Sequence, residues 1–180
     1  MWNHVRAVVL LPLMNTVIIP GTLLLLVRDF RLGGGYLLED LIAFALAAPL
    51  FAAGLFLAIR AIWLFIHRGR GTLAPWDPTR VLIAEDIYRF SRNPMKAGLF
   101  LILLGECILL RSEAQLIWTA CFIIANVIYI RVFEERGLQA RFGPAYDEYC
   151  NQVPRWIGKS AVEPGAQAEP ARSPIRVTLP

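Results

Sequence analysis

The sequence predicts an all-α integral membrane protein with about four transmembrane helices. Of its 180 residues, 57% are hydrophobic and only 18% are charged, whereas an ordinary soluble domain carries about 25% charged residues. A water-soluble fold of this size has too little interior to bury so many apolar side chains. The composition therefore excludes a disordered chain, a nucleic-acid-binding module and most cytosolic enzymes, and the length suits a single domain.

The first two predicted spans are residues 7–27 and 41–66. The first holds 21 residues without a charge, enough to cross about 30 Å of hydrocarbon at about 1.5 Å per residue. A basic residue precedes it, as in a signal peptide, but no small-residue cleavage site follows before Arg28 and Asp29, so we expect a retained anchor. The second span is interrupted only by Arg60, which lies close enough to one end to reach the interface.

The third and fourth predicted spans are residues 97–110 and 116–133. The third has only 14 residues and contains Glu106. An ionisable group in an apolar run is functional by default, although a protonated or arginine-paired structural residue is an equal alternative. A short polar step, residues 111–115, joins the two runs, so they are predicted to form a helical hairpin.

Charge placement predicts the orientation. Arg28, Arg31 and Arg111 lie on one side of this arrangement and Arg60 lies inside a span, whereas the other fourteen of the 18 basic residues lie on the opposite side. Because cytoplasmic segments are enriched in Lys and Arg, both termini and the loop over residues 67–96 are predicted to be cytoplasmic. We expect a membrane domain over residues 1–160. Residues 161–180, rich in proline and lacking hydrophobic periodicity, are predicted to be a disordered tail.

Metal chemistry is not expected. The chain has 3 cysteines, at positions 107, 121 and 150. They are too few and too scattered for a disulfide framework or a tetrahedral zinc site.

Two polar stretches on the predicted cytoplasmic side, residues 69–98 and 133–156, hold more specific patterns than membrane insertion requires. In chain order the patterns, with one on the intervening helix, are Gly69, Gly71, Thr72, Ala74, Pro75, Asp77 and Pro78; Tyr88, Arg89, Arg92, Asn93, Pro94, Met95 and Gly98; Leu103, Gly105 and Glu106; Glu134 and Glu135; Phe142, Gly143, Tyr146 and Tyr149; and Val153, Pro154, Arg155 and Trp156.

In these six patterns, which occur in this order, the sequence resembles the isoprenylcysteine carboxyl methyltransferase family of integral membrane methyltransferases, especially its small bacterial members. The resemblance spans about residues 7–157. The resemblance implies a helical membrane fold whose cytoplasmic loops form a cofactor pocket for S-adenosylmethionine, without a metal. It also implies a lipophilic small-molecule or lipid substrate, no nucleic-acid partner and a location in the bacterial inner membrane.

The function implied is S-adenosylmethionine-dependent methyl transfer to a lipophilic acceptor, with an isoprenylcysteine-like carboxylate as the expected acceptor. A carboxylate is already ionised near neutral pH and needs no strong base. One alternative is a phospholipid N-methyltransferase, whose cytoplasmic motifs are similar in kind. The other is a non-catalytic membrane scaffold that keeps the fold after losing the site.

The resemblance, together with the chemistry of the donor, selects the candidate site residues. Arginine grips a carboxylate as a fork, glutamate holds an ammonium, and aromatic faces suit an adenine or a cation. The candidate catalytic residues are Arg92, Glu134 and Arg155. The candidate cofactor-binding residues are Tyr88, Asn93, Pro94, Gly98, Glu135, Tyr146 and Tyr149.

Each candidate also has a plainer interpretation. Pro94 pushes Asn93 out of helical geometry and so breaks the chain before the third span, whether or not a ligand binds there. Basic residues and tyrosines are common at a membrane boundary. Glu134 and Glu135 project about 100° apart on a helix and cannot both face one ligand atom. Since Glu135 is four residues after Arg131 and could pair with it, Glu134 is favoured as the pocket carboxylate.

Four positions depart from the family pattern. Asp86 stands where the family has glycine, and Lys96 stands where it has tyrosine. Val127 replaces a histidine before the glutamate pair, and Arg136 replaces a proline after it. Asp86 loses the backbone freedom of glycine, and Lys96 exchanges an aromatic ring for a flexible cation. These two changes are the features that favour the scaffold alternative.

Overall fold

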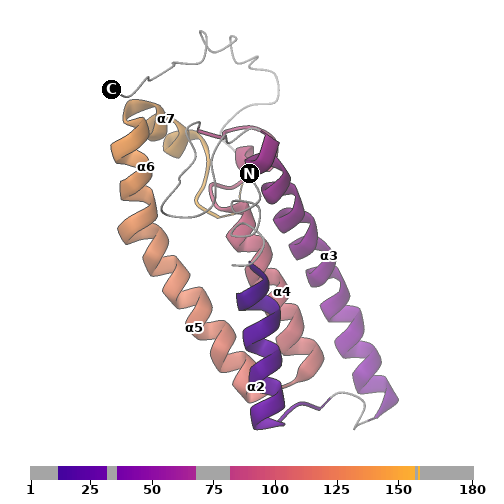
Figure 1. The fold of residues 1–180 in the computed structure, drawn as a ribbon. Helices are drawn as coiled ribbons and strands as arrows, with labels where there is room; N and C mark the ends of the chain where they lie inside the picture. Colours follow the sequence, from indigo (N-terminus) through magenta and orange to yellow (C-terminus); the bar gives the residue numbers. More distant parts are fainter. Residues whose placement is uncertain (1–11, 32–35, 68–81, 157, 159–180) are drawn as a thin grey trace.

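The computed structural model describes residues 12–31, 36–67, 82–156 and 158, and within these ranges every regular element is helical (Figure 1). The predicted all-α membrane fold is therefore confirmed. The glycine-rich turn at residues 69–78 and the tail at 161–180 lie outside the described residues. The elements in order are η1 (Met14–Ile18), α2 (Ile19–Val27), α3 (Leu37–His67), η2 (Asp86–Arg89), α4 (Pro94–Leu110), α5 (Glu113–Tyr129), η3 (Ile130–Glu134), α6 (Glu135–Phe142) and α7 (Pro144–Gln152).

Two helices in the described part of the chain are long and apolar enough to cross a membrane. They are α3, with 31 residues, and the continuous rod Glu113–Phe142, with 30 residues, which joins α5, η3 and α6. The elements η1 and α2 form a shorter apolar helix, and α4 covers the third predicted span. The fourth predicted span ends at residue 133, but the helix runs on to Phe142. The glutamate pair therefore lies on the same rod as the apolar span.

The hairpin predicted at residues 111–115 is present, between α4 and α5. Arg111 ends α4 in a left-handed conformation with φ of 50°. The Ser112 side chain then accepts a hydrogen bond from the backbone N–H of Gln115 at 3.1 Å, which caps the start of α5. These two residues reverse the chain and return it through the bundle.

Small residues bring α3 and α4 into backbone contact. A Cβ atom added to Gly98 would lie 2.7 Å from the carbonyl oxygen of Gly54, and a Cβ on Gly54 would lie equally close to the carbonyl of Gly98. Ala58 and Ala61 are buried on the same side of α3. Close approach through small residues is the usual way for helices to associate in lipid, where the hydrophobic effect gives no drive between them. The α3–α4 pair is thus the rigid part of the bundle.

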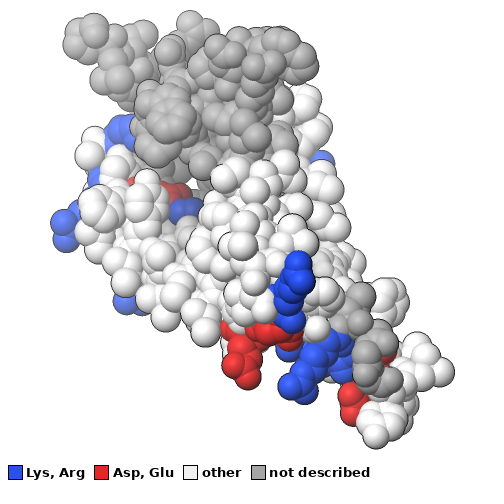
Figure 2. Space-filling model, turned by 60° about the horizontal axis from the view of Figure 1, so that its bottom comes forward, with Lys and Arg blue, Asp and Glu red and all other residues white. Residues whose placement is uncertain are grey.

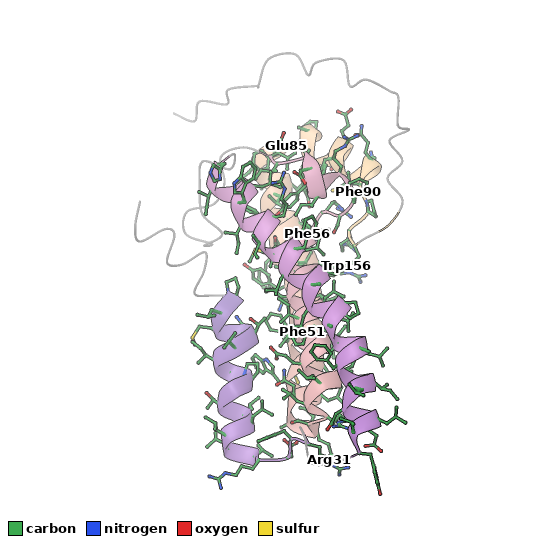
Figure 3. The ribbon with its side chains drawn as sticks, turned by 90° about the vertical axis from the view of Figure 1, so that its right-hand side faces the viewer. Arg31, Phe51, Phe56, Glu85, Phe90 and Trp156 are labelled. Atoms are coloured by element: carbon green, nitrogen blue, oxygen red, sulfur yellow. The ribbon has the colours of Figure 1, made fainter. Side chains whose placement is uncertain are left out.

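The two polar stretches meet at one end of the molecule, beside α6 and α7 (Figure 1). The backbone N–H of Arg92 donates to the carbonyl oxygen of Pro154 at 3.0 Å, and that of Gly158 donates to Phe90 at 3.4 Å. The view with side chains shows Phe90 near this end and Arg31 at the opposite end (Figure 3). Residues some 60 positions apart are therefore held side by side by the main chain.

Candidate functional site

The bend before α4 is built from buried polar groups. Asn93 has φ of −130° and ψ of 51°, and Pro94 takes the first position of the helix, where its missing N–H costs nothing. The Ser91 hydroxyl oxygen accepts from the backbone N–H of Asn93 at 3.1 Å. The Asn93 amide nitrogen donates to the carbonyl oxygen of Arg155 at 3.3 Å. These contacts hold the bend at Asn93 and Pro94 against the backbone of Arg155, so that Arg92 and Arg155 lie next to each other.

Three charged side chains converge at this bend, and we call Arg92, Glu135 and Arg155 the arginine–glutamate cluster. Arg155 donates from Nε and Nη2 to the two oxygens of Glu135, each at 2.8 Å. Arg92 Nη1 lies 3.2 Å from Oε1 of the same carboxylate. The side chains are 13%, 18% and 29% exposed for Arg92, Glu135 and Arg155, so the pairs are shielded from bulk water. Two cations around one anion leave the cluster with a net positive charge.

Arg92 has a second contact and a free donor. Its Nη1 donates to the sulfur of Cys150 at 2.7 Å. Its Nε is buried and has no hydrogen-bond partner among the described residues. Buried polar atoms are nearly always paired, so this unpaired donor is an exception, as is Nε of Arg111 at the opposite end. The sequence interpretation missed Cys150, although its position four residues after Tyr146 places it on the same helical face.

The aromatic candidates divide into two groups. Tyr146 and Tyr149 of α7 are 4% and 7% exposed, and their ring centroids lie 6.3 Å apart. Tyr88 instead packs its ring against α3, edge-on to Phe65 at 5.9 Å, and its carbonyl oxygen accepts from the Tyr149 hydroxyl at 2.8 Å. Burial raises the pKa of all three tyrosines above the ordinary value, so their hydroxyls remain protonated and can donate.

Glu134 points away from the arginine–glutamate cluster. Its Oε2 atom forms an ion pair with the Lys96 ammonium, and the same ammonium lies 4.9 Å from the centroid of the Tyr129 ring. Adjacent glutamates therefore face different partners, as their helical geometry predicted. The carboxylate between the arginines is that of Glu135, however, not the Glu134 carboxylate favoured from sequence. The reason is that Arg155, which is 20 positions away along the chain, pairs with Glu135.

The departure at Asp86 is compensated in the structure. Asp86 has φ of 59°, in the left-handed region, so the position keeps the conformation that glycine adopts freely. Its carboxylate forms an ion pair with Arg60 of α3. The hydrogen bond from Arg60 lowers the pKa of Asp86 below its ordinary value. Arg60 therefore anchors the loop before α4 instead of reaching out to lipid headgroups.

Gly98 and Glu106 belong to the scaffold. Gly98 lies against the backbone of α3, as described above, and so has a packing role. Glu106 accepts a hydrogen bond from the Gln115 amide at 2.6 Å, far along α4 from Arg92. Val127 is partly buried on α5 and Arg136 is exposed on α6. Within the described ranges, no group of three or more His, Cys, Asp or Glu side chains could hold a metal ion.

A family model for phospholipid methyltransferases matches residues 42–145, more than half of the chain. No curated protein and no solved structure gives a significant match. The matched range begins within α3 and runs through η2, α4, α5, η3 and α6 to the start of α7; it includes Arg92 and Glu135 of the arginine–glutamate cluster, while Arg155 lies beyond it. The chain therefore belongs to the phospholipid methyltransferase family, one of the isoprenylcysteine carboxyl methyltransferase-like membrane methyltransferases, and the resemblance read from the sequence is confirmed.

Proposed function

We propose that this member of a membrane methyltransferase family transfers a methyl group from S-adenosylmethionine to a lipophilic carboxylate, at the arginine–glutamate cluster. The observation that carries the proposal is the convergence of Arg92 and Arg155, from two distant polar stretches, on the single carboxylate of Glu135. A charged cluster this well shielded is unnecessary for membrane insertion. It suits the recognition of a small zwitterion, which needs both a cation and an anion at close range.

The residues present fit the polar groups of S-adenosylmethionine. The planar fork of Arg155, and the unpartnered Nε of Arg92, would bind the carboxylate of its amino-acid part. Glu135 would bind the ammonium. Tyr146 and Tyr149 are buried in a core cluster with Val153 and would support the site from within the protein. When bound, this donor supplies an electrophilic methyl group on a sulfonium centre.

The protein's own contribution is positioning and the exclusion of water. A carboxylate acceptor is a ready nucleophile at neutral pH, because its ordinary pKa lies near 4. An amine acceptor must first lose a proton. The two carboxylates at the site, Glu134 and Glu135, both pair with cations, so the described residues of the site offer no unpaired carboxylate. This charge arrangement supports transfer to a carboxylate, and it lets the reaction proceed without a general base.

Phospholipid N-methylation is the second candidate, and the family match favours it. Incubating membranes that contain the protein with a methyl-labelled donor separates the two reactions. Label released by base as volatile methanol indicates a methyl ester on a carboxylate. Label that migrates with phospholipid before base treatment and stays non-volatile after it indicates an N-methylated headgroup, and it would replace the carboxylate acceptor with an amine.

The donor site is tested by calorimetry on the purified chain in detergent. We expect wild type to bind S-adenosylmethionine with a dissociation constant on the order of micromolar, typical of enzyme substrates. Arg155→Ala should weaken binding at least tenfold, because it removes the bidentate fork. Arg136→Ala is the matched control, since Arg136 is exposed on α6 next to Glu135 and should have no effect. Folded wild type that fails to bind the donor would overturn the proposal.

A further inference from the structure

A small group of side chains lies next to the arginine–glutamate cluster and takes no part in binding the donor as proposed above. Lys96, in the first turn of α4, forms an ion pair with Glu134 at the end of η3. Its ammonium nitrogen also lies 4.9 Å from the centroid of the Tyr129 ring. The Phe133 ring stacks on Tyr129 with a centroid distance of 5.6 Å. One cation thus lies between a carboxylate and an aromatic face that come from the neighbouring helix.

A carboxylate beside an aromatic ring is the combination that proteins use to bind ammonium and quaternary ammonium groups. Here Glu134 and Tyr129 supply both parts, and the Lys96 ammonium fills the place of the ligand. Lys96 is therefore an internal occupant of a cation site.

The position of this site suits a lipid headgroup. The rod of α5, η3 and α6 leans away from α4 toward the end that carries α7 (Figure 1), and the Lys96–Glu134 pair bridges the two helices there. The side chains of Lys96 and Glu134 are 21% and 34% exposed. Tyr129 and Phe133 are 42% and 63% exposed on the apolar rod. The site can therefore be reached from the membrane, one residue away from Glu135.

We propose that Glu134 and Tyr129 form a headgroup site which Lys96 occupies, and that Lys96 thereby makes the enzyme reject lipids with an ammonium headgroup. The inference rests on the proposed function only in taking the surface at Lys96 and Glu134 as the place where the acceptor approaches. A cationic headgroup has to displace Lys96 and separate its ion pair with Glu134. An anionic headgroup meets the lysine ammonium instead. Lys96 is thus the residue that decides between carboxylate and amine acceptors.

Direct binding of charged amphiphiles tests this without methyl transfer. The full chain in dodecyl maltoside is titrated with hexadecyltrimethylammonium, with hexadecanol as the uncharged probe for micelle partitioning. Lys96→Met keeps the length of the side chain and removes its charge, so we expect the cationic probe to bind at least tenfold more tightly than to wild type. Lys96→Gln is the second variant, in case the apolar side chain perturbs folding, and melting by circular dichroism reports whether each variant is folded.

Two further variants test whether the tighter binding of the cationic probe takes place at Glu134 and Tyr129. Adding Glu134→Gln to Lys96→Met should abolish the tighter binding, because the carboxylate that faces the ammonium is gone. Adding Tyr129→Leu should reduce it severalfold through the lost aromatic face. Lys96→Arg is the matched control and should bind like wild type. Equal binding of the cationic probe by folded wild type, Lys96→Met and Lys96→Gln would overturn the inference.

Binding of the cationic amphiphile should not depend on an intact donor site. The variant Lys96→Met with Arg155→Ala should keep the tighter binding of the cationic amphiphile even though its affinity for S-adenosylmethionine is lost. A gain that disappears in this double variant would place the amphiphile in the arginine–glutamate cluster and would contradict a separate headgroup site. Failure of donor binding, by contrast, would overturn the proposed function and leave this measurement valid.

Discussion

The two ends of the helical bundle use charged side chains in different ways. The end formed by the α2–α3 and α4–α5 connections faces the viewer in Figure 2, and there charged side chains bind the main chain as well as each other. Asp29 accepts from the backbone N–H of Ala114 at 3.0 Å and from the Ser112 hydroxyl at 2.6 Å. Arg111 donates to the carbonyl oxygen of Arg31 at 2.7 Å and also forms ion pairs with Glu39 and Asp40. These contacts fasten the two connections together.

At the other end the charged side chains bind each other. Glu135 is held by Arg92 and Arg155, and Glu134 by Lys96. A carboxylate that satisfies backbone N–H groups at a helix start is a fixed part of the fold, since its removal leaves those donors unpaired. A guanidinium paired with one carboxylate can accept another carboxylate in its place. The difference teaches that the charges available to a ligand are those of a cluster held by side chains alone, without the main-chain contacts that fasten Asp29 and Arg111.

The largest effect is expected from Glu135→Ala. It leaves two neighbouring guanidinium groups without their shared partner in a shielded place, a change that typically costs about 3–5 kcal/mol. We therefore expect donor affinity and methyl transfer to fall by about 10²-fold or more. Calorimetry and incorporation of labelled methyl groups measure the two quantities. Glu113→Ala, which removes an exposed glutamate at the opposite end, is the control and should leave both unchanged.

A second prediction concerns Gly98, which was expected from sequence to bind the cofactor. In Gly98→Ala the new methyl group would meet the Gly54 carbonyl at 2.7 Å, so α3 and α4 must separate. Overpacking of this kind costs about 1–3 kcal/mol. We expect a lower melting temperature with the donor affinity of the folded protein unchanged. Gly137→Ala adds its methyl group to open space on α6 and should not lower the melting temperature.

A selective loss of donor affinity in Gly98→Ala, without any loss of stability, would show that Gly98 contacts the donor. It would also contradict the division between a packed α3–α4 scaffold and a site built around the bend before α4.

Local patterns predicted the fold and part of the site. Hydrophobic run lengths predicted helices close to those found, Pro94 predicted the bend at Asn93, and the 100° step separated the partners of adjacent glutamates. The pairs that build the site join positions far apart, 38 residues for Lys96 and Glu134 and 20 for Glu135 and Arg155. Spacing rules compare near neighbours only. They therefore predicted that Glu135 pairs with Arg131, one helical turn away, and could not detect the pair between Glu135 and Arg155.

Two substitutions of Asp86, with a smaller expected effect, test how the loop before α4 is anchored to α3. Asp86→Gly loses the ion pair with Arg60 but relieves the left-handed conformation at φ of 59°. Asp86→Ala loses the ion pair and keeps the strain, which costs about 1–2 kcal/mol for an ordinary residue. Thermal melting should rank Asp86→Ala as the less stable of the two by about 1 kcal/mol. The reverse order would mean that the conformation at residue 86 is not a source of strain.

The smallest effect is expected at the opposite end and depends on pH. The hydrogen bond from the Ala114 N–H, followed by that from Ser112, lowers the pKa of Asp29 below its ordinary value. The folded state therefore binds this proton less readily than the unfolded chain does. The stabilisation is complete above the unfolded pKa, about 3.9, and is lost as pH falls through the folded pKa. Asp29 lies at the surface and is partly exposed to solvent, so its contribution is small.

Comparing melting curves of wild type and Asp29→Asn from pH 7 to pH 3 isolates this contribution. The amide cannot ionise, so the difference in melting temperature between the two proteins should shrink as the pH falls below about 4. Donor affinity at neutral pH should be the same in both, because the Asp29 contacts fasten α5 to the neighbouring connection and lie at the other end from Arg92. A change in donor affinity would mean that the two ends are energetically coupled through the rod from α5 to α6. Charges at one end could then no longer be treated as purely structural and those at the other as purely ligand-binding.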